Sequence, residues 1–523
     1  MRVRAVAATP SAPVVPCLLS ALAVALVGGC AVGPDFKPPA APPVKSYLPP
    51  DSTVPADTGG QEPQRWIEGM DIPGQWWTLF HSPALDELIS RAFRANPSIE
   101  AAQAALREAD ESYAAQRGAL LPAVQAGYSV ERQRNAVGTL APTLSSGETV
   151  FTLHTAQVNV SYLLDLFGGA RRQAESLHAV ADAQRYELAA TYLTLASNVV
   201  AATIQLASIE AQLAATNDIV SSEREALDIL KRQYELGSIP MTDVMAQEAT
   251  LATTQATLPA LARQLDQTQH ALALLAGRFP GEQPPVRFEL PIAGAVPASA
   301  AAPVTAPTDA QTLSLPRDLP LSVPALLVRQ RPDVLAAEAQ LHAATAAVGV
   351  AIANMLPQIT LTATEGGAST ELAQLLASGN TFWSGGASLT QTLFSGGTLL
   401  HRERAARAGL DQAGAQYRLV VLTAFANVAD ALTALRHDAD AVEAGARAAH
   451  AAAESLTTIR HNVELGSTGY LALLNAQQTY QQAVLNLAQA QASRFADTAA
   501  LFQALGGGWW NSAEPALEVV PRG

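Results

Sequence analysis

Lysine is almost absent from this chain of 523 residues, which has only Lys37, Lys45 and Lys231. None of the three follows a glycine-rich loop, so a P-loop nucleotide site is excluded. Acidic side chains number 46 and basic ones 32, which gives a net charge of −14. A nucleic-acid-binding face needs a basic surface that displaces counterions from phosphates. The charge balance therefore excludes nucleic acid as a partner.

Residues suited to catalysis or metal binding are also sparse. Cys17 and Cys30 are the only cysteines and lie near the N-terminus, so the body has neither a disulfide framework nor a thiolate metal site. The nine histidines are scattered, and none has the HExxH spacing of a zinc protease. Ser467 lies in a Gly-Ser-Thr-Gly turn, which is not a nucleophile elbow. We predict that the chain is not an enzyme and uses no metal and no cofactor.

Residues 1–29 are predicted to form a signal peptide. Arg2 and Arg4 precede an apolar run of about ten residues, which is too short for a bilayer that needs about 20. The run ends in Val27-Gly28-Gly29-Cys30, which resembles a bacterial lipobox. This resemblance implies that Cys30 carries diacylglycerol and palmitate, which would anchor the chain to a membrane. A plain signal peptide with an incidental cysteine is the alternative.

Composition and an internal repeat divide the rest of the chain. Residues 30–65 are rich in proline and lack periodicity, so we expect a lipid-anchored extended linker. Two repeats follow at 66–279 and 318–508, with a Pro/Ala-rich linker at 280–317 between them and a C-terminal tail at 509–523. The paired signals are Asn96-Pro97 and Arg331-Pro332, Leu121-Pro122 and Leu356-Pro357, and Glu235-Leu236-Gly237-Ser238 and Glu464-Leu465-Gly466-Ser467. Each repeat should therefore run in the order helix, strands, long helix, turn, returning helix.

The long helix of each repeat carries a heptad pattern. Apolar residues recur at alternating spacings of four and three over 188–234, and again over 417–463 with smaller side chains. A period of 3.5 residues predicts a helix that supercoils around a partner. No proline interrupts 170–239, so about 65 residues would form a rod of about 100 Å.

Glycine ends both long helices. Gly237 and Gly466 are suited to the positive φ that terminates a helix, and Pro240 makes continuation of the first helix unfavourable. Returning helices are expected at Met241–Leu275 and Gly469–Leu505. From the helices alone, an ordinary coiled-coil or helical-bundle protein fits equally well.

Period-two patterns predict strands between the helices. They are expected near 124–130, 156–162, 359–363 and 387–393, with hairpin loops near 135–148 and 366–380. Alternation of apolar residues with polar, uncharged ones suits the wall of a membrane barrel. Four strands cannot close a barrel and a bilayer tolerates no open edge, so several chains would have to share one barrel; three copies would supply 12 strands. A soluble hairpin is the alternative.

Several motifs, in order along the mature chain, resemble those of the TolC-like outer-membrane efflux lipoproteins of the OprM/NodT type. The resemblance rests on the residues that follow Cys30, on two strand-to-helix junctions and on the start of each repeat. These motifs are Cys30-Ala31-Val32-Gly33-Pro34-Asp35-Phe36, Trp76-Trp77-Thr78-Leu79-Phe80, Asn96-Pro97, Leu164-Asp165-Leu166-Phe167-Gly168-Gly169, Arg331-Pro332-Asp333-Val334 and Leu393-Phe394-Ser395-Gly396-Gly397.

The resemblance implies a mainly α fold with a membrane β part, built from two internal repeats. It implies a trimeric 12-stranded β-barrel, with four strands from each chain, that continues into a 12-helix periplasmic coiled-coil tunnel. It also implies an outer-membrane location, favoured by Ala31 after the cysteine. The expected partners are an inner-membrane efflux pump and a periplasmic adaptor. The expected function is an exit duct that conducts drugs or other small toxic compounds passively.

The resemblance also assigns roles to the two turns. Gly237, Ser238, Gly466 and Ser467 match the helix tips where the adaptor docks, although the glycines could simply be helix C-caps. The family's periplasmic gate corresponds to Leu473, Leu474 and Asn475. Asn475 stands where the family often has aspartate, so a carboxylate ring is missing and closure should depend on packing around the two leucines.

Other readings use the same features. A duct for secreted proteins or heavy-metal ions would share the architecture, but the secretion branch usually lacks a lipobox and no His or Met cluster supports a metal duct. A lipid-tethered periplasmic coiled coil without a pore is an alternative of a different class, and the strand pairs argue against it.

Overall fold

The computed structural model describes residues 31–44, 46–47, 63–134, 149–282, 288–290, 311–321 and 324–512. The predicted signal peptide, Cys30 and the first predicted hairpin loop lie outside the described residues. The chain divides into two compact units, one of Met1–Pro39, Arg107–Ala183 and Glu338–Gln416, the other of Ala40–Leu106, Gln184–Ala337 and Tyr417–Gly523. Each is described in turn.

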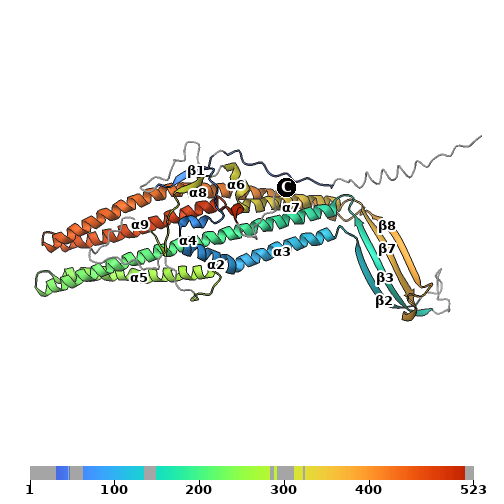
Figure 1. Ribbon diagram of the computed structural model, residues 1–523, viewed down its shortest axis with the longest axis horizontal. Helices are drawn as coiled ribbons and strands as arrows, with labels where there is room; N and C mark the ends of the chain where they lie inside the picture. The colour runs from blue at the N-terminus through green and yellow to red at the C-terminus, as the bar shows by residue number, and fades with distance from the viewer. Residues whose placement is uncertain are drawn as a thin grey trace, which may run out of the picture. The chain divides into compact units, whose positions relative to one another are not determined.

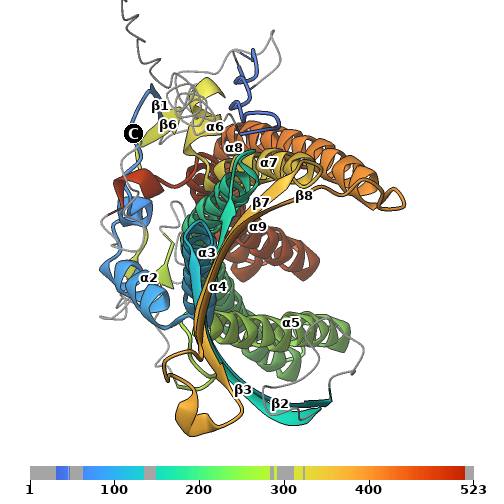
Figure 2. The ribbon, with the colours of Figure 1, turned by 90° about the vertical axis from the view of Figure 1, so that its right-hand side faces the viewer.

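The first unit contains a four-stranded antiparallel sheet, curved in Figure 2. Its strands are β2 (Ala123–Arg134), β3 (Val150–Leu164), β7 (Gln358–Ser369) and β8 (Thr381–Thr390), in the order β2-β3-β7-β8. Each repeat therefore contributes one hairpin, as expected. The central pairing of β3 with β7, in which Val158 lies opposite Glu365, joins the two repeats.

The strands are longer than predicted, and the fourth begins and ends earlier in the chain than predicted. It was expected near 387–393 but occupies Thr381–Thr390, and β7 continues through Gly366 and Gly367 into the predicted loop. Glycines at 366, 367, 385 and 386 interrupt the alternation of side chains on which the prediction depended. The ladder of backbone hydrogen bonds to neighbouring strands keeps these residues extended nevertheless.

The two faces of the sheet differ in polarity. Residues directly opposite in a ladder project to the same side. One side carries mainly apolar residues and the other mainly polar, uncharged ones. The apolar side includes Val124, Ala126, Tyr128, Val158, Val160, Leu361, Ala363, Ala387 and Leu389, and the polar side includes Gln125, Ser129, Gln157, Asn159, Thr360, Thr362, Ser384 and Ser388. Val124 and Tyr128 are 67% and 54% exposed, so no part of the chain described here covers the apolar side over β2.

The contacts of Asp165 explain why the Leu-Asp-Leu-Phe-Gly-Gly motif stands at the junction between strand and helix. Asp165 follows β3 and accepts hydrogen bonds from the backbone N–H groups of Ala170 (3.1 Å) and Arg171 (3.0 Å), at the start of α4 (Gly169–Glu235). It therefore satisfies donors that a helix N-terminus leaves without partners. Most of α7 (Pro332–Ala353), which precedes β7, also lies in this unit.

The second unit contains two long helical hairpins, visible in Figure 1. The first joins α4 to α5 (Met241–Leu275), and the second joins α8 (Thr398–Glu464) to α9 (Tyr470–Ala504). These bounds agree with the predicted turns and returning helices. The predicted heptad positions of α4 are mostly buried, among them Leu188, Leu195, Val199, Leu206, Ile209, Val220, Leu227 and Leu230.

In each repeat, the residue before the helix that leads to the strands binds the end of the returning helix. Asn96, before α3 (Pro97–Gly118), donates from its amide to the carbonyl of Leu275 (2.8 Å). Arg331, the corresponding residue before α7, donates to the carbonyl of Ala504 (2.9 Å). Both side chains satisfy carbonyl groups that the end of a helix leaves without a partner.

Short elements complete the second unit. They are β1 (Arg65–Glu68) paired in parallel with β6 (Asp318–Leu321), β4 (Phe288–Glu289) paired in parallel with β5 (Gln311–Thr312), the helices α2 (Pro83–Ala95) and α6 (Pro324–Gln330), and 3-10 turns at Trp76–Phe80 and Trp509–Asn511. Trp76 is 1% exposed and stacks on Phe502 of α9, with ring centroids 5.5 Å apart. Trp509 donates from its indole to the carbonyl of Gln330 (2.6 Å), so the first residues of the predicted tail pack on the body.

Three helices, α4, α7 and α8, are long and apolar enough to cross a membrane by length and composition. In α4 that apolar window is 67% buried inside the chain. Its apolar side chains therefore serve helix packing, as the heptad pattern predicted.

Candidate functional site

The two predicted tips have the same backbone geometry. Gly237 (φ 73°) and Gly466 (φ 71°) adopt the left-handed conformation that ends each long helix. The N–H of Ser238 donates to the carbonyl of Gln233 and that of Ser467 to the carbonyl of Asn462, both at 3.0 Å. With the bonds from the glycine N–H groups, this is a Schellman motif at each tip. Each serine hydroxyl also donates to the same carbonyl, at 2.7 and 3.0 Å.

Each tip presents a leucine to solvent. Leu236 and Leu465, which directly precede the two glycines, are 83% and 67% exposed. The four predicted tip residues, Gly237, Ser238, Gly466 and Ser467, are exposed as well. A rigid turn with an exposed leucine at its apex can insert that side chain into an apolar pocket of another protein. The two leucines were not among the predicted tip residues, although the repeated Glu-Leu-Gly-Ser sequence contains them.

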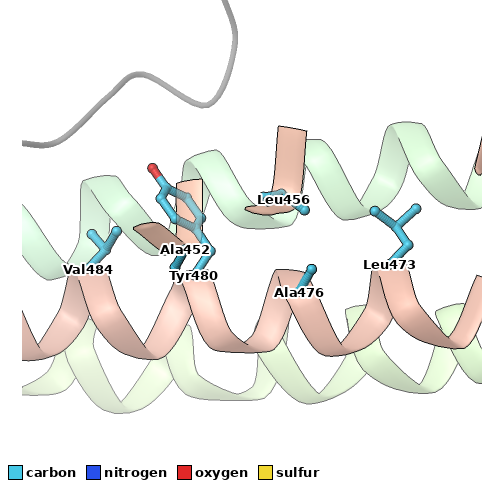
Figure 3. Close-up of a cluster of buried hydrophobic side chains, with 6 residues drawn as sticks. All are labelled: Ala452, Leu456, Leu473, Ala476, Tyr480 and Val484. Carbon is cyan, nitrogen blue, oxygen red and sulfur yellow. The ribbon is translucent and has the colours of Figure 1, made fainter. Parts of the chain in front are cut away.

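Two of the three predicted gate residues are buried within the chain itself. Leu473 and Leu474 are 6% and 7% exposed. Leu473 belongs to a cluster between α8 and α9, drawn in Figure 3 with Leu456 facing it from α8. The other members of this cluster are Ala452, Ala476, Tyr480 and Val484. Leu473 therefore helps to hold the two helices of the hairpin together. Asn475 alone of the three predicted gate residues is exposed.

Asn475 begins a stripe of uncharged polar residues along α9. Exposed residues recur at spacings of three and four, which places them on one side of the helix. The stripe consists of Asn475, Gln478, Gln482, Asn486, Gln489 and Ser493. Gln482 donates from its amide to the carbonyl oxygen of Asn486 (2.8 Å). Apart from Asn475, the residues of this stripe were not predicted as site residues, although their spacing of three and four is visible in the sequence.

Polar contacts join the two hairpins near their tips. The hydroxyl of Tyr470 on α9 donates to Oε1 of Gln247 on α5, and the amide of Gln247 donates to the carbonyl of Glu223 on α4 (2.8 Å). Arg460 on α8 donates from its guanidinium to the hydroxyl of Ser222 on α4 (2.8 Å). Burial raises the pKa of Tyr470, and the nearby charges of Glu223 and Asp243 raise it further, so the tyrosine keeps the proton it donates.

Glu223 is a buried carboxyl group in this region. It is 1% exposed, and Thr254 donates a hydrogen bond to its Oε1 (3.1 Å). Its Oε2 and both amide atoms of Gln477 have no hydrogen-bond partner in the part of the chain described here, and both residues line one small cavity. Burial raises the pKa of Glu223, and the bond from Thr254 opposes this rise only in part.

A second carboxyl pair lies further along the same hairpin. Asp438 on α8 is partly buried and hydrogen-bonded to Asp497 on α9. Burial, this bond and repulsion between the two carboxyl groups raise the pKa of Asp438 to about 7, and the positive charge of Arg494 opposes the rise. Two carboxyl groups this close hold one proton between them more readily than none.

Among the described residues, no group of three or more His, Cys, Asp or Glu side chains is placed to hold a metal ion. The tips, the polar stripe and the two-sided sheet are instead features of a conduit and of a surface for partners.

Comparisons with known proteins agree with this geometry. The family model for outer membrane efflux proteins matches residues 88–278 and 323–507. A pyoverdine export outer membrane protein of Pseudomonas putida is 31% identical over 470 residues, which cover 88% of this chain and 94% of that protein. A toluene efflux pump outer membrane protein of Pseudomonas putida is 30% identical over 95% of this chain and 97% of that protein.

Solved structures show the same fold. The outer-membrane channel OprN is 26% identical, with a TM-score of 0.78 over 92% of this chain and 100% of that one. The CmeC outer membrane channel of Campylobacter jejuni is 19% identical and shares the fold, with a TM-score of 0.79 over 93% of this chain and 96% of that one. The chain therefore belongs to the outer membrane efflux protein family and is an outer-membrane exit duct of an efflux pump.

Proposed function

We propose that three copies of this chain close one 12-stranded barrel in the outer membrane. The open four-stranded sheet is the observation that supports this proposal. Its edge strands, β2 and β8, each have a neighbour on one side only among the described residues. An apolar face with two free edges is not stable in lipid, because each unpaired backbone group costs several kcal/mol there. Pairing β8 of one copy with β2 of the next removes every edge.

The inner wall of this barrel is the polar face of the sheet, on which Gln157 and Asn159 lie. The stripe on α9 that begins at Asn475 likewise presents mainly amide groups. A wall of uncharged hydrogen-bonding groups carries little fixed charge, so it conducts neutral and charged organic molecules alike. The cargo is a small organic toxic compound or drug, a class that the toluene and pyoverdine proteins among the relatives support.

The tips dock a periplasmic adaptor, which links the duct to an inner-membrane pump that supplies the energy. Leu236 and Leu465 anchor this contact, beside Gly237, Ser238, Gly466 and Ser467. The glycines set the turn, and each serine stiffens it through its bond to a backbone carbonyl. A preorganised turn loses little conformational entropy on binding.

The periplasmic gate narrows at Asn475, next to the buried Leu473 and Leu474, and Leu473 packs against α8. Three asparagines around an axis would narrow the opening without the cation attraction of a carboxylate ring. Cys30, after removal of residues 1–29, carries diacylglycerol and palmitate and anchors the chain to the outer membrane.

Native mass spectrometry of the protein extracted from outer membranes tests the shared barrel. We expect a mass of three chains with three lipid adducts. A stable monomer would overturn the barrel, because four strands cannot close alone.

The tips are tested by Leu236→Asp with Leu465→Asp in a strain lacking the native protein. We expect trimers of native mass and drug susceptibility equal to that of the deletion strain. Leu274→Asp is the matched control, because Leu274 is 70% exposed and lies at the other end of α5. Full resistance in the double variant would exclude the leucines as the docking anchors.

A further inference from the structure

The residues that follow Cys30 lie against α4 and α7, on a surface here called the groove. The strap, defined as residues 31–36, passes three glycine contacts that leave no room for a side chain. A Cβ on Gly33 would lie 2.4 Å from the Cα of Gly349, and one on Gly349 would lie 2.8 Å from the carbonyl oxygen of Val32. A Cβ on Gly168 would lie 2.6 Å from that of Ala31. The fit is therefore one of backbone against backbone.

A buried arginine on α4, Arg172, binds the strap through its side chain. The side chain of Arg172 is 7% exposed, and its Nε donates to the carbonyl of Val32 (3.3 Å). One terminal nitrogen pairs with the carboxylate of Asp35, and the other donates to Glu175 (2.7 Å). A buried guanidinium is stable only when its donors are paired in this way. Arg172 therefore depends on the strap for two of its partners.

The far end of the strap is held by an aromatic contact. Phe36 stacks on the ring of His342, with centroids 4.3 Å apart and planes 14° from parallel. The Nε2 of His342 lies 2.9 Å from Glu175, which also binds Arg172. Burial by itself would raise the pKa of Glu175, but the bonds and charges of His342 and Arg172 outweigh it and lower that pKa. Glu175 is therefore ionised and links both contacts.

The near end of the strap is attached at the boundary between sheet and helix. The N–H of Val32 donates to the carbonyl of Phe167 (3.0 Å), which lies between the end of β3 and the start of α4. Cys30 lies outside the described residues and directly precedes Ala31 in the sequence. A lipid on Cys30 would therefore be attached two residues before Val32.

We propose that this groove is a binding site for the strap and that Arg172, by binding the strap, holds the lipidated end of the chain at the membrane-side end of the helices. This arrangement, here called the mount, lets the acyl chains stabilise the channel. The inference rests on the proposed lipidation of Cys30. A lipid on a flexible tether adds membrane affinity but no stability to the fold, because the tether decouples the two. A lipid on a docked strap stabilises whichever state keeps the strap docked, by linkage.

A thermal cycle on four proteins in outer-membrane lipid nanodiscs tests the mount. They are the native chain, Cys30→Ala with the signal peptide of a non-lipidated protein, Arg172→Gln, and both changes together. The measured quantity is the temperature at which the trimer dissociates. We expect loss of the lipid to lower it by several degrees with Arg172 present and by less than half as much in Arg172→Gln.

Arg171→Gln is the matched control. Arg171 is the next residue, carries the same charge, and pairs with Asp165 at 3.2 Å outside the groove. We expect it to leave the effect of the lipid unchanged. An equal lipid effect in Arg172→Gln and in the native background would overturn the mount.

Asp35→Asn covers the case in which Arg172→Gln fails to fold. The side chain of Asp35 is 83% exposed, and Arg172 would keep its pairing with Glu175. We expect this variant to reduce the lipid effect too, and an unreduced effect would again overturn the proposal.

The native mass of the protein distinguishes failure of the proposed lipid anchor from failure of the mount. A trimer without lipid adducts would exclude the anchor and the mount but leave the shared barrel standing, whereas an adduct-bearing trimer with no coupling would exclude the mount alone.

Discussion

Tyr470, on the first turn of α9, donates its hydroxyl hydrogen bond to Oε1 of Gln247 on α5, and so connects the returning helices of the two repeats. Gln247 is 0% exposed and also binds the backbone of α4. Three of the four helices near the tips therefore meet at one glutamine. A movement that parts the hairpins must break this contact.

We predict that Tyr470→Phe weakens the closed arrangement by about 1–2 kcal/mol, because it leaves a buried acceptor on Gln247 without its donor. In planar bilayers the variant should open more often than the native channel. Tyr234→Phe is the control, since Tyr234 is 45% exposed at the tip. Equal opening of Tyr470→Phe and the native channel would show that this hydrogen bond does not hold the hairpins closed.

Glu223→Gln should stabilise the protein increasingly as the pH rises. The folded state raises the pKa of Glu223, so between the ordinary value of 4.5 and the raised value the folded state binds more protons than the unfolded state. Stability then falls as the pH rises through the folded pKa. The amide is neutral at every pH and removes this loss.

Thermal unfolding from pH 5 to pH 8 measures the effect. The control is Glu225→Gln, which alters an exposed carboxylate two residues away. If the difference in thermal stability between Glu223→Gln and the native chain stayed the same from pH 5 to pH 8, Glu223 would not be the titrating group.

Asp438→Asn should remove a second pH dependence of the unfolding free energy, centred at a higher pH than that of Glu223. The pKa of Asp438 is raised to about 7 from 3.8, so the folded state loses stability as the pH rises from about 4 through 7. Discounted for partial exposure, the amide should gain about 1–2 kcal/mol at pH 8 and nothing near pH 4. Unfolding by guanidinium chloride at both pH values measures this, and a gain of the same size at pH 4 would rule out proton linkage.

Trp76→Ala should cost about 3–5 kcal/mol of unfolding free energy, because it empties a fully buried site that Phe502 and Phe80 enclose. Circular dichroism in guanidinium chloride measures the loss without relying on tryptophan fluorescence. Phe279→Ala, at a side chain 76% exposed, should change the value by less than 0.5 kcal/mol. A loss below about 1 kcal/mol for Trp76→Ala would mean that the ring cluster is not a core.

The repeat and the helices could be read from local signals. Gly237 and Gly466 end their helices as predicted, and α5 begins at Met241 and ends at Leu275 as predicted. Helix boundaries depend on the φ that each residue tolerates and on nearby backbone bonds, and both are properties of neighbours in the chain. The strands were harder, because Gly366 and Gly385 carry no side chain whose alternation could be seen.

The sequence by itself determined the anchor motif, the two repeats, the coiled-coil seam and the alternation that predicts a two-sided sheet. Only the tertiary structure decided which residues meet across the chain: β3 with β7, Tyr470 with Gln247, Arg172 with the strap, and Leu473 with Leu456. Such contacts join residues distant in sequence. Their geometry depends on how whole helices pack, and no local pattern records it.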